Sequence, residues 1–246
     1  MVLAVIPARY ASTRFPGKPL AMIAGKSMIQ RVYEQVLAST QVQKIVVATD
    51  DERIWQHVTE FGGEVLMTSP DHSNGTARVA EASRQYPEAT IIVNVQGDEP
   101  FVDSATVDNL VLAFTDSLVD IATPAHPITE EAALLSPNVV KVVRSASGRA
   151  LYFSRHAIPY LRDQPVGTWI HQQTHLQHVG LYAYRAPILQ RLVELPPHPL
   201  ELNESLEQLR WLAHDLTIKV TLTDKRSRGI DTPADLAEAE RRLLGK

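Results

Sequence analysis

Short apolar runs alternate with helical patterns along the first half of this 246-residue chain. The apolar runs are Val2 to Ile6, Lys44 to Thr49, Glu64 to Met67 and Ala89 to Val95. Between the first two runs, apolar residues from Met28 to Leu37 fall on one face of a helix. Strands rich in Val and Ile that are joined by such helices favour a mostly parallel sheet covered on both faces. The pattern therefore predicts an α/β three-layer sandwich, with ligands at the carboxyl ends of the strands.

The alternation of apolar runs and helical patterns ends in the second half of the chain. Two apolar runs flank Ser147 and Gly148 and predict a strand pair, Val139 to Arg144 with Ala150 to Ser154. A polar stretch from His156 to Gln177 follows, and we expect it to cover the binding site. The remaining elements are predicted in the order strand 179–184, helix 203–214, strand 216–222 and a last helix.

The last helix has a start signal in the sequence. Thr232 followed three residues later by Asp235 forms a capping-box pattern, and Pro233 suits the first helical turn. Neither an internal repeat nor a low-complexity linker divides the sequence. We therefore predict a single domain over residues 1–246.

The loop after the first predicted strand gathers groups that bind phosphate. It runs PARYASTRFPGKPL, with Arg9, Ser12, Arg14 and Lys18 as polar side chains beside Gly17. Arginine grips phosphate oxygens with two parallel hydrogen bonds, lysine supplies a compact charge, and backbone N–H groups add donors. The loop matches neither the P-loop nor the dinucleotide-binding glycine pattern, so these two enzyme classes lose support. A solvated basic loop is the alternative.

Two aspartates occupy predicted loops far apart in the sequence. Asp98 follows a buried run at the carboxyl end of a strand, and Asp231 precedes the last helix. Magnesium prefers oxygen ligands and commonly takes one or two carboxylates together with substrate phosphates. The pair would suffice for a magnesium site over a triphosphate, although a turn residue and a helix cap remain alternatives.

A series of motifs resembles, in the same order, those of the 3-deoxy-manno-octulosonate cytidylyltransferase family. The first loop, IPARYASTRFPGKPL, is also similar to the N-terminal signature of nucleotide-sugar pyrophosphorylases. The further motifs are ATD at 48–50, DH at 71–72, GT at 75–76, NVQGDEP at 94–100, YFSR at 152–155, HVGLY at 178–182, LEQLR at 206–210 and GIDTP at 229–233. The resemblance covers nearly the whole chain.

The resemblance implies a fold, a reaction and a division of the chain. The fold is Rossmann-like, of the nucleotide-diphospho-sugar transferase type, with a smaller covering and dimerisation region. The reaction converts CTP and 3-deoxy-D-manno-octulosonate (Kdo) into CMP-Kdo and diphosphate for lipopolysaccharide biosynthesis. We expect Mg²⁺ as cofactor and a homodimer. Residues 1–138 would mainly bind nucleotide, 139–215 would mainly bind sugar and form the dimer, and 216–246 would return to the main sheet.

The resemblance also implies roles for individual residues. Arg9, Lys18 and Asp98 would be catalytic, and Asp98 and Asp231 would hold the metal. The nucleotide would be bound by Arg9, Ser12, Arg14, Lys18, Gly75, Thr76, Arg78 and Gln96. The sugar would be bound by Arg155, His178, Tyr182, Glu207 and Gln208, with Arg155 on its carboxylate. A general base is not identifiable from the sequence.

Three features leave alternatives open. Ala77 stands where the family commonly has an acidic residue, and Leu161 stands in a segment where Trp-Asp is expected, so the sugar preference is in question. Two interpretations compete with the Kdo enzyme. One is a CMP synthetase for a related acid sugar, 8-amino-Kdo or sialic acid, and the other is a non-catalytic nucleotide-binding protein. His171, His175 and His178 have a spacing that suits a zinc site on one helical face, but the strand-like sequence after His178 argues against it.

Composition and charge limit the remaining function classes. The sequence has 44% hydrophobic and 21% charged residues and a formal net charge of -4, which gives no general attraction to nucleic acid or an anionic membrane. It contains no cysteine, so thiol chemistry is excluded. The opening MVLAVI is apolar but breaks at Pro7, too early for a signal segment or a membrane span. We therefore expect a cytoplasmic enzyme without membrane insertion.

Overall fold

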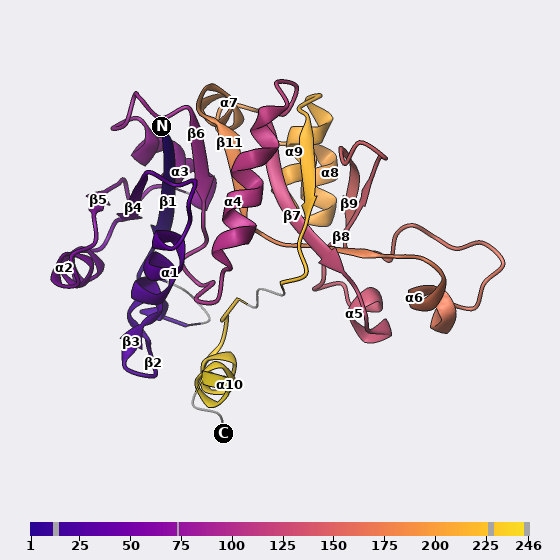
Figure 1. The fold of residues 1–246 in the computed structure, drawn as a ribbon, viewed down its shortest axis with the longest axis horizontal. Helices are drawn as coiled ribbons and strands as arrows, with labels where there is room; N and C mark the ends of the chain where they lie inside the picture. The colour runs from indigo at the N-terminus through magenta and orange to yellow at the C-terminus, as the bar shows by residue number, and fades with distance from the viewer. Residues whose placement is uncertain (12–14, 73, 226–228, 244–246) are drawn as a thin grey trace.

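A ten-stranded mixed sheet organises the residues that the computed structural model describes, which are 1–11, 15–72, 74–225 and 229–243. Its order is β5-β4-β1-β6-β11-β7-β10-β8-β9, with β12 paired to β7 (Figure 1). The strands are β1 (Val2–Ala8), β4 (Lys44–Thr49), β5 (Val65–Met67), β6 (Ile91–Asn94), β7 (Ile121–Pro127), β8 (Lys141–Arg144), β9 (Ala150–Ser154), β10 (Leu176–His178), β11 (Tyr182–Arg185) and β12 (Ile218–Leu222).

The strands from the amino-terminal part of the chain run parallel to their neighbours in the sheet, except where β6 meets β11. Strands β5, β4, β1 and β6 are parallel to one another, and β12 is parallel to β7. Strand β11 is antiparallel to both β6 and β7, and β10 is antiparallel to β7 and β8. The mostly parallel α/β fold predicted from the apolar runs is confirmed.

Helices cover both faces of this sheet. The longer helices are α1 (Met28–Leu37), α2 (Glu52–Glu60), α3 (Gly75–Ser83), α4 (Ser104–Leu112), α7 (Ala186–Leu192), α9 (Glu207–Ala213) and α10 (Pro233–Leu243). The shorter helical segments are η1 (Lys18–Leu20), η2 (Ala113–Thr115), α5 (Glu131–Leu135), η3 (Val166–Thr168), α6 (Trp169–Gln172) and α8 (Pro199–Glu204). In the part of the chain that is described, no helix combines the length and apolar character that crossing a membrane requires.

The side chains of β1 show why the helices lie on two faces. Successive residues of a strand point to opposite faces. Leu3 and Val5 join a buried cluster with residues of α3, α7 and α9, whereas Ala4 and Ile6 join a second cluster with residues of α1 and α4. Because β1 is buried on both faces, its sequence is a continuous apolar run rather than an alternating one.

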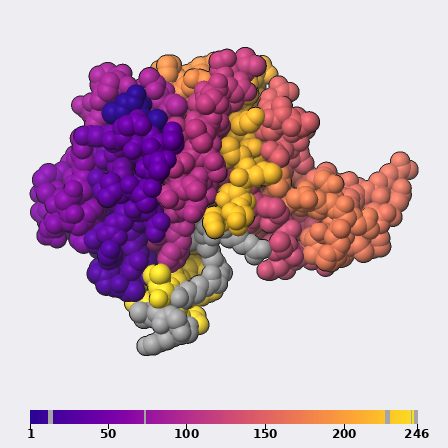
Figure 2. Space-filling model, viewed as in Figure 1, coloured from indigo at the N-terminus to yellow at the C-terminus, as the bar shows by residue number. Residues whose placement is uncertain are grey.

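The predicted hairpin in the second half is confirmed. Strands β8 and β9 pair antiparallel, with Lys141 opposite Ser154, and Gly148 adopts a left-handed φ of 84° at the turn. The polar stretch that follows contains η3 and α6, which pack with α5 around Leu134, Ala157 and Trp169. Figure 2 shows this region projecting from the main body of the molecule.

Two predictions of local structure need correction, and one strand was missed. The helix predicted over 203–214 is two helices, α8 and α9, because Ser205 takes a left-handed φ of 51° between them. The strand predicted over 179–184 comprises Tyr182–Arg185, preceded by the separate strand β10. The buried strand β7 was not predicted, since Pro124, His126 and Pro127 interrupt its apolar pattern.

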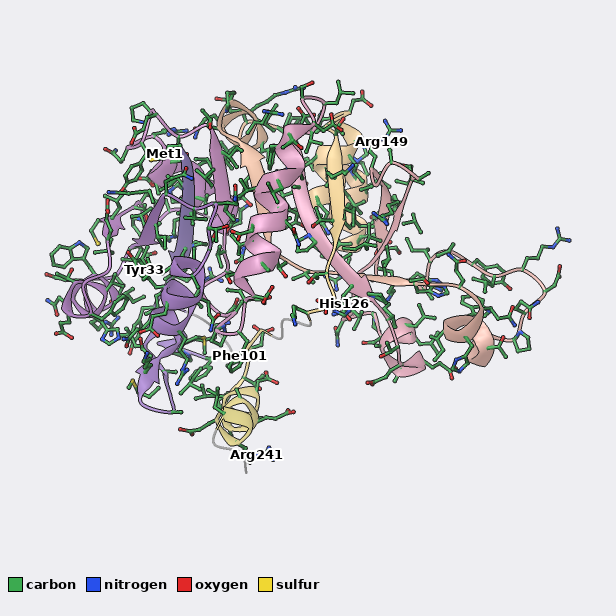
Figure 3. The ribbon with its side chains drawn as sticks, in the orientation of Figure 1. Met1, Tyr33, Phe101, His126, Arg149 and Arg241 are labelled. Carbon is green, nitrogen blue, oxygen red and sulfur yellow. The ribbon has the colours of Figure 1, made fainter. Side chains whose placement is uncertain are left out.

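The last helix packs away from the sheet, beside the β2–β3 hairpin (Met22–Ile23 and Lys26–Ser27). Asp235 accepts hydrogen bonds from the backbone N–H and the hydroxyl of Thr232, so the predicted capping box is confirmed. Ala239 and Ile230 form a small apolar cluster with Ile23, against which Phe101 packs (Figure 3). The segment before α10 is thereby held next to the loop that follows β6.

Candidate active site

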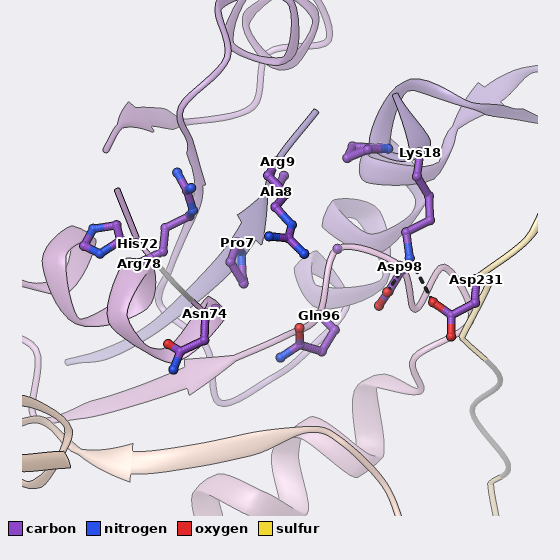
Figure 4. Close-up of a pocket in the computed structure, with 13 residues that line it drawn as sticks. Pro7, Ala8, Arg9, Lys18, His72, Asn74, Arg78, Gln96, Asp98 and Asp231 are labelled. Carbon is purple, nitrogen blue, oxygen red and sulfur yellow. Dashed lines mark hydrogen bonds and ion pairs between the residues drawn. The ribbon is translucent and has the colours of Figure 1, made fainter. Parts of the chain in front are cut away.

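A cavity of about 230 Å³ lies at the carboxyl ends of β1 and β6 (Figure 4). This is where a parallel α/β sheet places its ligands. Seven of the residues proposed from sequence line it, namely Arg9, Lys18, Gly75, Arg78, Gln96, Asp98 and Asp231. Pro7, Ala8, Pro19, His72, Asn74 and Gly97 complete the described lining. The fold thus gathers side chains from four separate loops around one space.

Carboxylates and a lysine form one end of this cavity. Lys18 Nζ lies 2.6 Å from Asp98 Oδ2 and 3.3 Å from Asp231 Oδ1, so one ammonium bridges the two aspartates. The backbone supports the pairing, because the N–H of Ile230 donates to the carbonyl of Asp98 at 2.9 Å. Burial, together with the negative charges of Asp98 and Asp231, raises the pKa of the adjoining Glu99 to about 7.

Tight backbone packing fixes the loops that carry these groups. A Cβ atom at Gly97 would lie 2.8 Å from the carbonyl oxygen of Pro7, so only glycine lets the β6 loop approach β1 this closely. Gly17 has a left-handed φ of 71° and donates its N–H to the carbonyl of Tyr10 at 2.9 Å. The guanidinium of Arg53 stacks 3.3 Å above the Tyr10 ring. Ser12 and Arg14, also proposed for phosphate binding, lie outside the described residues.

The opposite end of the cavity is formed by the start of α3 and the loop before it. Arg78 is buried and donates to Asp50 at 2.8 Å and to Thr68 at 2.6 Å. Two of its guanidinium nitrogens therefore already have protein partners. His72 lines the same end and is in contact with Glu81, whose pKa is lowered by that hydrogen bond.

Hydrogen bonds connect this end of the cavity to α9. The Thr76 hydroxyl donates to Glu207 at 2.7 Å, and the Asn74 amide donates to the same carboxylate at 3.1 Å. Arg210 donates to Glu207 at 2.8 Å. Burial raises the pKa of Glu207, while the hydrogen bond from Thr76 and the charge of Arg210 act in the opposite sense. The first turn of α3 and the first turn of α9 therefore meet at one carboxylate.

Two more of the proposed sugar residues, His178 and Tyr182, are linked to α9 by contacts between aromatic rings. His178 and Tyr182 have ring centroids 5.4 Å apart, and Tyr182 contacts Trp211 edge-on at 5.1 Å. Burial lowers the pKa of His178 to about 3, so its imidazole is neutral near pH 7. Gln208 Nε2 and Trp211 Nε1 are buried without a hydrogen-bond partner among the described residues. A bound ligand or water can satisfy buried donors of this kind.

Arg155 is placed apart from this group. Its guanidinium donates to the backbone carbonyls of Glu204 at 2.6 Å, Pro137 at 2.9 Å and Ser205 at 3.3 Å. In this arrangement Arg155 holds the α8–α9 turn against the loop before β8. Its contact with the sugar carboxylate stays a prediction.

The structure also bears on the zinc alternative and on the two departures from the family pattern. His171 lies on α6, which ends before His175, and His178 lies on β10, so the three imidazoles do not share a helical face. The described residues contain no group of three or more His, Asp or Glu side chains arranged to hold a metal. Ala77 lies in the first turn of α3, and Leu161 packs in the α5–α6 cluster.

Sequence reasoning missed two polar side chains of the cavity lining. Asn74 is the N-cap of α3 and accepts from the N–H of Ala77 at 2.9 Å, which an Asn before a Gly-Thr helix start signals. His72 belongs to the DH motif at 71–72 but carries no predicted role. Both lie at the end of the cavity away from the carboxylates (Figure 4).

Comparisons with known proteins agree with this geometry. A family model described as cytidylyltransferase matches residues 3–218. A 3-deoxy-manno-octulosonate cytidylyltransferase from Parabacteroides distasonis is 48% identical over 96% of both chains. One from Bacteroides thetaiotaomicron is 48% identical over 99% of this chain and 98% of its own.

Solved structures share the fold of this chain. CMP:2-keto-3-deoxy-manno-octonic acid synthetase complexed with CTP superposes with a TM-score of 0.93 at 41% identity, covering 99% of this chain and 98% of its own. A 4-diphosphocytidyl-2C-methyl-D-erythritol synthase from Anaerococcus prevotii shares the fold at a TM-score of 0.64 and 12% identity, covering 99% of this chain and 96% of its own.

The fold, with its basic loop and acidic pair at the strand ends, defines a nucleotidyltransferase. The chain belongs to the cytidylyltransferase family and is an enzyme of this type. Its near-full-length relatives are 3-deoxy-manno-octulosonate cytidylyltransferases.

Proposed function

We propose that this enzyme transfers CMP from CTP to 3-deoxy-D-manno-octulosonate and releases diphosphate. The observation that carries the proposal is the cavity in which Arg9, Lys18, Asp98 and Asp231 converge at the ends of β1 and β6. Basic side chains suit the phosphates of CTP, and the orphaned donors near α9 suit the hydroxyls of an acid sugar. The near-full-length identity to relatives of that name supports the choice of sugar.

We further propose that Asp98 and Asp231 hold Mg²⁺. The donor chemistry fits, because two carboxylates face one point and magnesium completes its coordination with phosphate oxygens and water. When bound, the ion would neutralise charge that develops on the phosphates and lower the pKa of a nearby hydroxyl.

The chain's own residues would position the reactants. The anomeric hydroxyl oxygen of the sugar forms a bond to the α-phosphorus of CTP, and the bond from that phosphorus to the bridging oxygen of diphosphate breaks. We assign no residue as general base, and the hydroxyl proton passes to solvent. Arg9 and Lys18 would bind the phosphates, Gly75, Thr76, Arg78 and Gln96 would line the nucleotide, and Ser12 and Arg14 would add to the loop.

On the sugar side, we propose that His178, Tyr182, Glu207 and Gln208 contact hydroxyls and that Arg155 contacts the carboxylate. Residues 1–138 would mainly bind nucleotide, 139–215 would bind sugar and form a homodimer, and 216–246 would return to the main sheet. Tyr160, which is 72% exposed on the projecting region, fits a dimer contact there. We place the enzyme in the cytoplasm, supplying lipopolysaccharide biosynthesis.

Diphosphate release tests this function. With CTP and Mg²⁺, we expect release that depends on 3-deoxy-D-manno-octulosonate and is much weaker with ATP, GTP or UTP. Arms containing the 8-amino sugar and sialic acid test the related specificities. If CTP bound but no acid sugar triggered release, the transferase assignment would fail in favour of a nucleotide-binding protein.

A further inference from the structure

Lys18 occupies the point at which the two proposed metal ligands face each other. Its ammonium lies 2.6 Å from Asp98 and 3.3 Å from Asp231, and its side chain is 14% exposed. An ammonium and a divalent cation cannot share this position, because both need the same carboxylate oxygens and repel each other.

We propose that Lys18 is an exchangeable counter-ion for the metal site. It offsets part of the negative charge of Asp98 and Asp231 before nucleotide binds, and it moves to the triphosphate when metal and CTP enter. This inference rests on the proposed metal role of the two aspartates and adds a positioning role to Lys18 beyond phosphate binding.

The aspartates keep their places without help from Lys18. Asp98 is held by the hydrogen bond from the N–H of Ile230 to its carbonyl and by the close approach of Gly97 to β1. Asp231 directly precedes the capping box of Thr232 and Asp235, and its N–H donates to Asp235 at 3.2 Å. The backbone that carries the two carboxylates therefore stays in place when the ammonium leaves.

The lysine side chain can move while its backbone stays fixed. Lys18 begins the short helix η1, which is closed by hydrogen bonds from Leu20 to Gly17 at 2.9 Å and from Ala21 to Lys18 at 3.1 Å. Its flexible four-carbon stem places the charge in the cavity that Arg9 also lines (Figure 4). A rotation about the stem exchanges carboxylate partners for phosphate partners without rebuilding the loop.

The exchange predicts weak metal binding in the absence of nucleotide. A bare divalent ion must first displace Lys18, whereas a metal that arrives with a triphosphate brings the anion that accepts the lysine. Removing the lysine charge while keeping the stem should therefore tighten metal binding, although the same change weakens nucleotide binding.

Mn²⁺ binding to the nucleotide-free protein, followed by electron paramagnetic resonance, tests this inference. We expect Lys18→Met to bind Mn²⁺ at least about tenfold more tightly than the wild type, because a competing unit charge a few ångströms away is gone. Lys18→Arg, which keeps the charge, should bind as weakly as the wild type. Lys18→Gln repeats the test if the methionine variant does not fold.

A second variant separates this inference from the metal assignment. Asp98→Asn in the Lys18→Met background should abolish the tight site. If Lys18→Met bound Mn²⁺ no more tightly than the wild type while Asp98→Asn still weakened binding, the counter-ion role would be overturned and the metal ligands would stand. If Asp98→Asn left the tight site intact, both the metal role and the exchange would be wrong.

Discussion

The proposed binding region has two ends, the cavity lined by Lys18 and Arg78 and the part of α9 that holds Gln208 and Trp211. The polar groups of these two ends differ in whether they have protein partners. Around the cavity, Lys18 is paired with Asp98 and Asp231, and Arg78 is paired with Asp50. On α9, the neutral donors of Gln208 and Trp211 are buried without partners among the described residues.

The energetics of burial explain this difference. An unpaired buried charge costs far more than an unpaired neutral donor, so charged groups need protein partners until a substrate arrives. A neutral amide or indole N–H can be left for a sugar hydroxyl to satisfy at a smaller cost. Each of the following changes affects one side of this comparison.

Asp98→Ala removes a charge from the paired end. We expect kcat for diphosphate release to fall by about 10³-fold, because a ligand of the proposed Mg²⁺ is removed, and with it the stabilisation that the ion would give to charge on the phosphates. Steady-state diphosphate release measures the effect. Asp116→Ala, a change at an exposed aspartate that does not line the cavity, serves as the matched control and should retain wild-type rates. Equal losses in both variants would contradict the assignment.

Arg78→Met breaks the buried ion pair. The free energy of unfolding should fall by about 3 kcal/mol, since Asp50 is left as a poorly compensated, partly buried carboxylate. Urea unfolding measures this change. Adding Asp50→Asn should restore more than half of the loss, and the absence of any rescue would show that the pair does not act as a unit.

Gln208→Leu alters the unpaired end. The KM for the acid sugar should rise about tenfold, because a hydrogen bond to the ligand is lost. The free energy of unfolding should not fall, because the amide nitrogen has no protein partner to lose among the described residues. Kinetics with the sugar varied, together with urea unfolding, measure both effects. A clear loss of stability without a change in KM would assign Gln208 to folding instead.

His178→Gln changes the acid sensitivity of the fold. The folded-state pKa of His178, about 3, lies below its unfolded value, so its contribution is present above about pH 6.5 and is lost as pH falls toward 3. Between about pH 8 and pH 5.5, the wild type should lose about 1 kcal/mol more unfolding free energy than the variant. Urea unfolding at both pH values checks this, and equal losses would show that His178 can be protonated in the folded protein.

The sequence predicted those parts of the fold that local pattern determines. Apolar runs located β1 and β4, and the Thr232–Asp235 pattern located the start of α10. The strand β7 was not predicted, because its burial depends on neighbouring strands on both sides and because its prolines are typical of loops. The helix break at Ser205 was not predicted either, because the sequence does not indicate that a serine adopts the left-handed conformation.

The site shows the same limit. Motifs predicted which loops carry the phosphate-binding and acidic residues, since each motif is local. They could not predict that Glu207 meets Thr76, 131 residues away in sequence, or that Lys18 bridges two aspartates. These contacts depend on how α9 and the segment before α10 pack against the sheet, which no short pattern encodes.

Measuring the KM for both substrates in Lys18→Met and Gln208→Leu tests the division between the two ends most directly. We predict that Lys18→Met raises the KM for CTP with little effect on that for the sugar, and that Gln208→Leu does the reverse. If either variant raised both constants to the same extent, the two ends would not act as separate binding regions, and the division between a charged end and a neutral end would be contradicted.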